Sequence, residues 1–225
     1  MINLASYIDH TILKPTTSRI DIKKISEEAD SYGFAAVCVP PPAIGWAKDW
    51  LHGNGSVKTA TVIGFPFGYS DTAAKMAESR QALADGADEL DVVINLMSLR
   101  AGEWDKMRHE ISDLTRLIHD HGKIIKVIIE SGILSDEEII RCCEVYGPLG
   151  IDFMKTSTGY AEKGATVAAV QLMRQHLPPT VRIKASGGIR QYEFAKSLVD
   201  AGADRLGCSA SVEIVKGAPA ANGGY

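Results

Sequence analysis

The sequence predicts a single-domain (β/α)8 barrel, also called a TIM barrel, on the strength of three observations. Eight short apolar, β-branched segments recur along the 225 residues. Helical periodicity separates them, with one strand and one helix repeating every roughly 23 to 35 residues. No linker or block of charge divides the chain, so we expect one barrel domain over residues 1–216 and a short flexible C-terminal tail over 217–225. An open doubly wound sheet would also alternate strand and helix, but eight evenly spaced units favour the closed barrel.

Each expected strand is a short apolar run bounded by glycine or polar residues. Such runs are typical of strands that are buried on both faces in a parallel sheet. The predicted strands cover residues 6–10, 35–39, 58–64, 89–95, 124–130, 151–156, 181–186 and 204–207.

Several of the intervening helices carry end signals of their own. Ser135, with Glu138 three residues later, forms a capping box, and Gly147 is expected to end that helix. Asp71 is expected to cap a helix over 72–84. A further helix has apolar residues at i, i+3 and i+4 spacing with a glycine beyond its end: Trp104, Met107, Ile111, Leu114, Ile118 and then Gly122.

Composition argues against several classes of protein. The net charge of −4 argues against a nucleic-acid or anionic-membrane surface. No apolar run approaches the roughly 20 residues of a membrane span, and no signal peptide is visible. The histidines lack metal-ligand spacing, so no metal site is expected. The four cysteines lack C-x-x-C spacing and are interpreted as reduced thiols in a cytoplasmic protein: Cys38, Cys142, Cys143 and Cys208.

Polar residues at the predicted strand ends mark the candidate site, because the active site of such a barrel lies at the C-terminal ends of its strands. Lys155 ends the sixth strand and Lys184 lies on the seventh, although a buried ammonium is costly to desolvate. Two carboxylates and three lysines are expected in one mouth. The full set is Asp9, Thr11, Cys38, Asp91, Lys126, Lys155, Lys184 and Ser209.

Lys155 is the candidate nucleophile. A free lysine has a pKa near 10.4 and is almost wholly protonated at neutral pH, so an attacking amine needs a pKa lowered to about 7, a change of roughly 4 to 5 kcal/mol. Burial and the nearby cation of Lys184 both act in that direction. The structural alternative is a strand-end lysine whose amine reaches solvent.

The other polar residues have supporting interpretations. Asp91 is suited to proton transfer beside an imine, and it is also suited to being a buried counter-ion of Lys126 or Lys184. Lys126 is interpreted as a supporting charge. Cys38 is interpreted as a small buried hydrophobe that lines the pocket.

Two loops of small residues follow the seventh and eighth strands. Gly187 and Gly188 let the backbone approach a ligand closely, and a helix follows them. Ser209 lies in a similar loop after the eighth strand. Phosphate groups are often bound at these two places in such barrels, so we expect an anion site there.

Six motifs in order resemble the deoxyribose-phosphate aldolase family over essentially the whole chain. They are Ile8-Asp9-His10-Thr11-Ile12-Leu13, Val37-Cys38-Val39-Pro40, Leu90-Asp91-Val92-Val93, Lys126-Val127-Ile128-Ile129-Glu130, Phe153-Met154-Lys155-Thr156-Ser157-Thr158-Gly159 and Lys184-Ala185-Ser186-Gly187-Gly188. The resemblance implies a cofactor-free class I aldolase on a (β/α)8 barrel. Such an enzyme cleaves 2-deoxyribose 5-phosphate to acetaldehyde and glyceraldehyde 3-phosphate, and a homodimer is expected.

The resemblance also implies roles for individual residues. Lys155 would form the Schiff base, with Asp91 and Lys184 as the proton-transfer pair, and a mobile C-terminal tyrosine, Tyr225, would assist. Gly187, Gly188 and Ser209 would bind the phosphate, and the residues expected to line the substrate site are Asp9, Thr11, Cys38, Lys126 and Thr156. Some members carry a lysine where this chain has Tyr160, so phosphate binding would rest on backbone groups, or on Lys163 if its loop folds inward.

Two alternatives remain open from the sequence. A Schiff-base aldolase acting on a keto acid or a ketose phosphate would share Lys155. A non-catalytic sugar-phosphate binding protein would keep the glycine loops and bind its ligand without turnover.

Overall fold

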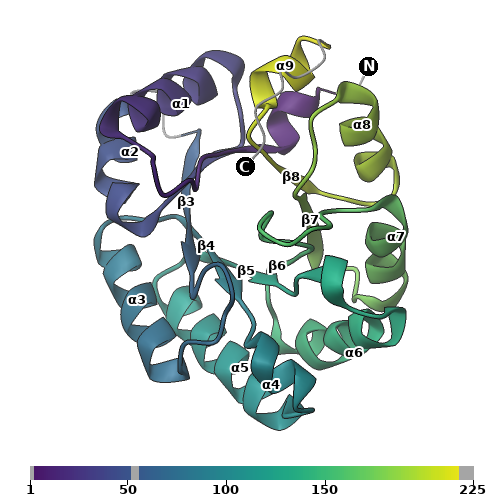
Figure 1. Cartoon of the computed structure of the whole chain (residues 1–225). Coiled ribbons are helices and arrows are strands. Elements are labelled where there is room, and N and C mark those ends of the chain that lie inside the picture. The colour runs from purple at the N-terminus through teal and green to yellow at the C-terminus, as the bar shows by residue number, and fades with distance from the viewer. Residues whose placement is uncertain (1–2, 52–55, 218–225) are drawn as a thin grey trace.

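The computed structural model describes residues 3–51 and 56–217, and its strands close into a parallel barrel (Figure 1). Neighbours in sequence are neighbours in space from β1 to β8, and β8 pairs with β1. The predicted (β/α)8 barrel is therefore confirmed. The strands are β1 Ile8–Thr11, β2 Ala36–Val39, β3 Lys58–Ile63, β4 Glu89–Val93, β5 Ile124–Ile128, β6 Phe153–Lys155, β7 Arg182–Ser186 and β8 Arg205–Cys208.

Helices surround the barrel on the outside (Figure 1). They are α1 Arg19–Tyr32, α2 Ile44–Trp50, α3 Thr72–Ala84, α4 Leu96–Arg100, α5 Trp104–Asp120, α6 Asp136–Tyr146, α7 Val167–His176, α8 Tyr192–Asp200 and α9 Ser211–Val215. Short 3-10 turns occur at Leu4–Tyr7, Pro41–Ala43, Ser131–Ile133 and Gly147–Leu149.

The local signals predicted most of the element ends. The capping box of Ser135 and Glu138 is present at the start of α6. Asp71 does precede α3, but its side chain makes no capping hydrogen bond there. Gly147 keeps right-handed helical angles, so the chain continues from α6 into a 3-10 turn and reverses only at Gly150, where φ is 76°.

Each predicted strand extends at least one residue beyond the observed strand, and the first and the fourth show a physical reason. The first begins at Ile8, because Leu4–Tyr7 forms a 3-10 turn in which the Asn3 side chain accepts a hydrogen bond from the Ala5 N–H. The fourth ends at Val93, because Asn95 caps α4 by accepting a hydrogen bond of 3.1 Å from the Ser98 N–H. In both cases a residue assigned to the strand, Tyr7 or Asn95, lies in a helical turn or caps one, a distinction that periodicity over so few residues does not make.

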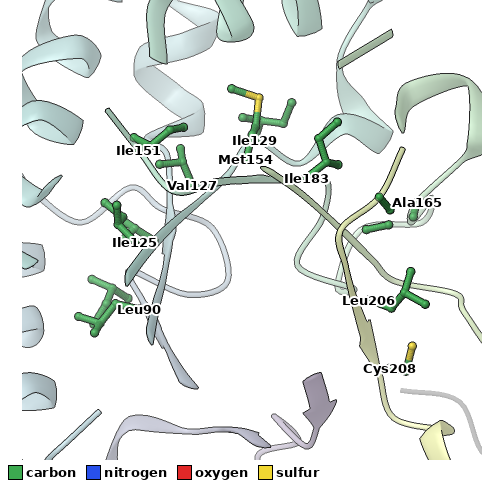
Figure 2. Packing of buried hydrophobic residues seen from close by; sticks show 14 of the residues in the cluster. Leu90, Ile125, Val127, Ile129, Ile151, Met154, Ala165, Ile183, Leu206 and Cys208 are labelled. Carbon is green, nitrogen blue, oxygen red and sulfur yellow. The ribbon is translucent and has the colours of Figure 1, made fainter. Parts of the chain in front are cut away.

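The outward side chains of the strands form the main hydrophobic core with the helices. On β4, Leu90 and Val92 point outward, and the same alternation runs through β5 to β8. Figure 2 shows this layer at Leu90, Ile125, Val127, Met154, Ile183 and Leu206. Burying each of these side chains contributes about 1.5–3 kcal/mol. This layer fixes the direction of the alternate side chains, which point into the barrel.

The inward side chains divide the barrel interior into two halves. On β2 and β3 they are small and apolar, and with Leu13 and Phe65 they form a second cluster: Ala36, Cys38, Ala60 and Val62. On β1 and on β4 to β8 many are charged: Asp9, Glu89, Asp91, Lys126, Lys155, Lys184 and Arg205. The register places Asp91 beside Lys126, and Lys155 beside Lys184. The expected constellation is therefore assembled inside the barrel.

Three further observations concern membrane spans, cysteines and metal sites. No helix in the described part of the chain is long and apolar enough to cross a membrane. The four cysteines are free and buried. Over residues 3–51 and 56–217, no group of three or more His, Cys, Asp or Glu side chains is arranged to hold a metal ion.

Candidate active site

Three lysines converge on the carboxylate of Asp91. The Asp91 Oδ2 atom lies 2.8 Å from Lys155 Nζ and 2.7 Å from Lys184 Nζ, and Oδ1 lies 2.7 Å from Lys126 Nζ. Asp91, Lys126 and Lys184 are fully buried, and Lys155 is 2% exposed. The carboxylate thus links strands β4, β5, β6 and β7 at one point.

A second set of ion pairs braces this centre. Arg205 lies 2.6 Å from Asp9 and 3.3 Å from Glu89, and Lys126 lies 2.6 Å from Glu89. Lys184 forms a very short ion pair with Asp9. Both oxygens of Asp9 are therefore engaged by cations, which places Asp9 among the supports of the site and leaves it less available to a substrate than expected.

The charges of this cluster do not balance when every lysine is protonated. In the described part of the chain, the carboxylates of Asp9, Glu89 and Asp91 face four cations, namely Lys126, Lys155, Lys184 and Arg205. Among these ion pairs Lys155 contacts a single carboxylate, whereas Lys126 and Lys184 each contact more than one. Because a buried uncompensated charge is costly, Lys155 is the group that most readily gives up its proton.

The pKa directions agree with that assignment. Burial lowers the pKa of Lys155; Asp91 opposes this and Lys184 adds to it, and the net direction is downward. Burial also acts to lower the pKa of Lys184, but Asp9 and Asp91 outweigh it and raise that pKa. Burial would raise the pKa of Asp91, yet the three lysines hold it well below its usual range. The site therefore combines the less basic amine of Lys155 with the Lys184 ammonium and the Asp91 carboxylate, which both stay charged.

Arg205 and Glu89 are site residues that sequence reasoning missed. Glu89 lies two residues before Asp91, which puts both on the inner face of β4, and Arg205 is paired with Lys184 in the register of β7 and β8. The period-two spacing from Asp91 could have identified Glu89. Arg205 has no such signal, because only closure of the barrel brings it to Asp9.

Replacing Arg205 by methionine is expected to lower the free energy of unfolding by about 3–5 kcal/mol, because Asp9 and Glu89 would stay buried without their guanidinium. Urea unfolding measures the loss. The matched control is Arg116→Met, which removes an arginine from the exposed surface of α5. Equal losses in the two variants would contradict the bracing role.

The remaining predicted residues lie at the same end of the barrel. The Thr11 hydroxyl donates to the Asp9 carbonyl at 2.9 Å, and the Thr156 hydroxyl oxygen accepts from the Ser186 N–H at 3.0 Å. Both hydroxyls therefore hold strand ends in place. Cys38 is buried in the apolar half of the barrel, and burial raises the pKa of its thiol, as expected for a small hydrophobe. Tyr225 lies outside the described residues.

The two glycine-containing loops do meet. Gly187 and Gly188 have φ values of 89° and 76°, which favour glycine over residues with a side chain. Together with Gly207, Ile189, Arg190 and Ser209 they line one cavity. Lys163 is exposed and its backbone packs against Gly132, so it does not line this cavity. Arg190 is the cationic side chain that the cavity lining presents instead.

A family model described as DeoC/LacD family aldolase matches residues 3–216. The deoxyribose-phosphate aldolase of Thermococcus gammatolerans is 48% identical over 217 residues, which cover 96% of each chain. That of Caldanaerobacter subterraneus is 46% identical, covering 96% of this chain and 94% of the relative.

Solved structures are similar over the same length. The structure titled "QR15, an Aldolase" superposes with a TM-score of 0.90 at 38% identity and covers 96% of both chains. Deoxyribose phosphate aldolase from Aeropyrum pernix, described as a unique tetramer, gives a TM-score of 0.85 at 33% identity, covering 95% of this chain and 89% of that one.

Proposed function

Since the chain belongs to the DeoC/LacD family of aldolases, we propose that it cleaves 2-deoxy-D-ribose 5-phosphate reversibly to D-glyceraldehyde 3-phosphate and acetaldehyde through a Schiff base on Lys155. Its relatives at 44–48% identity carry the name deoxyribose-phosphate aldolase. The observation that carries the proposal is the buried Lys155 amine, whose pKa is lowered and which lies 2.8 Å from Asp91.

The first step uses the neutral amine of Lys155. Its Nζ attacks the C1 aldehyde of the open-chain sugar, and loss of water from the carbinolamine gives an iminium. Burial and the Lys184 ammonium favour the neutral amine before the attack. Once the iminium carries a positive charge, the nearby Asp91 carboxylate stabilises it.

The second step breaks the C2–C3 bond. Asp91, assisted by Lys184 and through a water molecule, takes the proton of the C3 hydroxyl, so that C3 becomes the aldehyde carbon of glyceraldehyde 3-phosphate. The bonding electrons move to form an enamine between C1 and C2, with the iminium as their acceptor. Protonation at C2 and hydrolysis then release acetaldehyde and free Lys155.

The phosphate is proposed to bind in the cavity of Gly187, Gly188, Ser209 and Arg190. Gly187 follows Lys184 by three residues, roughly 10 Å further along the chain direction. A phosphate held there lies beyond the reacting amine, toward the open end of the barrel, with Arg190 to balance its charge. This arrangement leaves the aldehyde end of the sugar directed toward Lys155.

The test is a substrate panel that follows acetaldehyde and glyceraldehyde 3-phosphate separately. We expect turnover of 2-deoxy-D-ribose 5-phosphate and little turnover of a keto-acid aldol or a ketose phosphate. Preference for either of the latter would favour an aldolase with a different donor. Tight binding of the sugar phosphate without any product would favour a non-catalytic binding protein.

Replacing Lys184 by leucine is expected to raise the pKa of Lys155. The change removes a cation that disfavours the charged form of Lys155, and it leaves Asp91 one competing partner fewer. The acid limb of the pH profile for borohydride trapping of acetaldehyde should therefore move to higher pH. Trapping at neutral pH should fall about tenfold for every full pH unit by which the limb moves. An unchanged limb would show that Lys184 does not tune Lys155.

Three further features belong to the same proposal. We place residues 1–216 in the catalytic barrel and assign Tyr225, in the tail, an assisting role in proton transfer. We also propose a cytoplasmic location, supported by the free thiols, and a homodimer, whereas the Aeropyrum pernix relative is described as a tetramer. Light scattering on the purified chain distinguishes a dimer from a tetramer.

A further inference from the structure

The loop between β6 and α7, residues 156–165, is anchored at both ends and is called the β6 loop below. At its start, the Thr156 carbonyl accepts a hydrogen bond of 2.7 Å from the Ser131 N–H. At its end, the Ala165 N–H lies 2.9 Å from the Ser186 carbonyl and 3.1 Å from that of Gly187. The β6 loop is thus joined to the chain that follows β5 and to the proposed phosphate-binding loop after β7.

Contact with that phosphate-binding loop is close. A Cβ atom added to Gly164 would lie 2.3 Å from the Gly187 carbonyl oxygen, and one added to Gly187 would lie 3.4 Å from the Gly159 Cα. Because the two backbones touch, a displacement of the β6 loop would alter the wall of the phosphate cavity.

Glu130, which follows β5, and Thr158 of the β6 loop form a buried anchor. Glu130 follows β5 with φ of 56°, and its carboxylate accepts hydrogen bonds from the Thr158 hydroxyl, in a very short contact, and from the Thr158 N–H at 3.3 Å. The Thr158 hydroxyl oxygen in turn accepts from the Tyr160 N–H at 3.0 Å. This chain of bonds fixes the backbone from which the Tyr160 side chain starts.

Tyr160 then reaches across the mouth of the barrel. Its hydroxyl donates to the Leu13 carbonyl at 2.9 Å, just beyond β1, and its ring meets Phe65, just beyond β3, edge to face at 5.3 Å. In the closed order β1 to β8, β1 and β3 each lie three strands from β6 (Figure 1). The side chain therefore bridges loops from well-separated sides of the mouth, with β7 and β8 between β6 and β1, and β4 and β5 between β3 and β6.

The reacting groups are closed off in this arrangement. Lys155 is 2% exposed, and Asp91 and Lys184 are fully buried. Lys155 therefore offers a substrate very little accessible surface in this arrangement. The hydrogen bond from Tyr160 to Leu13 is neutral, and such a bond is weaker than the buried charge-assisted bond between Thr158 and Glu130.

We propose that Tyr160 determines which aldehydes reach Lys155, by acting as a latch that holds the β6 loop over the barrel mouth and must release from Leu13 to admit substrate. This role rests on the proposed Schiff-base chemistry of Lys155. The Glu130–Thr158 anchor stays intact on release, so the Tyr160 end of the loop moves while its buried end does not.

Amide hydrogen exchange tests the latch independently of any activity. Tyr160→Phe removes the hydroxyl and keeps the ring, and it should speed exchange in peptides covering residues 158–165 by about two- to tenfold, the range that one neutral hydrogen bond spans. The control is Tyr69→Phe, the same change in an exposed tyrosine that stacks on Phe67. Unchanged exchange in the β6 loop of Tyr160→Phe would overturn the proposal.

Borohydride trapping at Lys155 tests the selection of substrates. With acetaldehyde, hexanal and benzaldehyde as probes, Tyr160→Phe should raise the trapping rate, and by a larger factor for the bulkier aldehydes; Tyr160→Ala should extend this trend. Slower trapping in Tyr160→Phe, or the same factor for all three aldehydes, would overturn the selecting role. Absence of trapping in the wild-type protein would instead refute the Schiff-base function, and the latch would then be judged by hydrogen exchange.

Discussion

Replacement of Lys155 by leucine is expected to lower kcat by at least about 10⁴-fold while leaving the barrel folded. The change removes the amine whose pKa is lowered. It also removes one positive charge from a cluster in which four described cations face three carboxylates, so that Lys126, Lys184 and Arg205 balance Asp9, Glu89 and Asp91. Steady-state cleavage of the sugar phosphate measures the loss, and urea unfolding measures stability.

The control is Lys196→Leu, which removes an exposed lysine from α8 and should leave both quantities unchanged. Substantial cleavage by Lys155→Leu would show that another amine forms the Schiff base. Collapse of the fold would show instead that the cluster needs all four of its cations.

Replacement of Asp91 by asparagine should separate the two chemical steps. The carboxylate normally raises the pKa of Lys155, so its loss lowers that pKa further and shifts the acid limb of trapping to lower pH, opposite to the shift in Lys184→Leu. Schiff-base formation with acetaldehyde should survive, whereas cleavage should fall by about 10²–10⁴-fold because the proposed proton acceptor is gone. Stability should fall by about 3–5 kcal/mol, because three buried lysines lose a shared partner.

Asp9→Asn is the matched control for that variant. Asp9 is as deeply buried and also pairs with Lys184, but its ion pairs within the described residues do not include Lys155. Its loss should reduce stability in a similar way and leave the ratio of cleavage to trapping nearly unchanged. If Asp91→Asn kept that ratio as well, Asp91 would be a counter-ion only.

Most of the barrel could be predicted because a strand that is buried on both faces is a short apolar run in the sequence. In a run such as Leu90-Asp91-Val92-Val93, the outward apolar residues pack against the helices. The observed strands lie in those runs. The ends were less predictable. Asn95 directly follows an apolar run in sequence, and the hydrogen bond from the Ser98 N–H shows that its side chain caps α4.

The centre of the site was predictable for a related reason. A lysine or aspartate inside an apolar strand is costly unless it is paired, so Lys155, Lys184 and Asp91 stood out. Arg205 did not, since a charged residue at the start of a strand is ordinary and its pairing with Asp9 depends on β8 closing against β1. The Glu130–Thr158 anchor depends on a left-handed backbone conformation at Glu130, which the residue pattern does not predict.

The measurement that tests the central claim most directly is incubation of the wild-type protein with acetaldehyde and borohydride, followed by peptide mapping by mass spectrometry. The lowered pKa of Lys155 and the raised pKa of Lys184 predict a single reduced two-carbon adduct on Lys155. An adduct on Lys184 would reverse the roles of the two lysines. No adduct in folded protein would contradict the Schiff-base mechanism altogether.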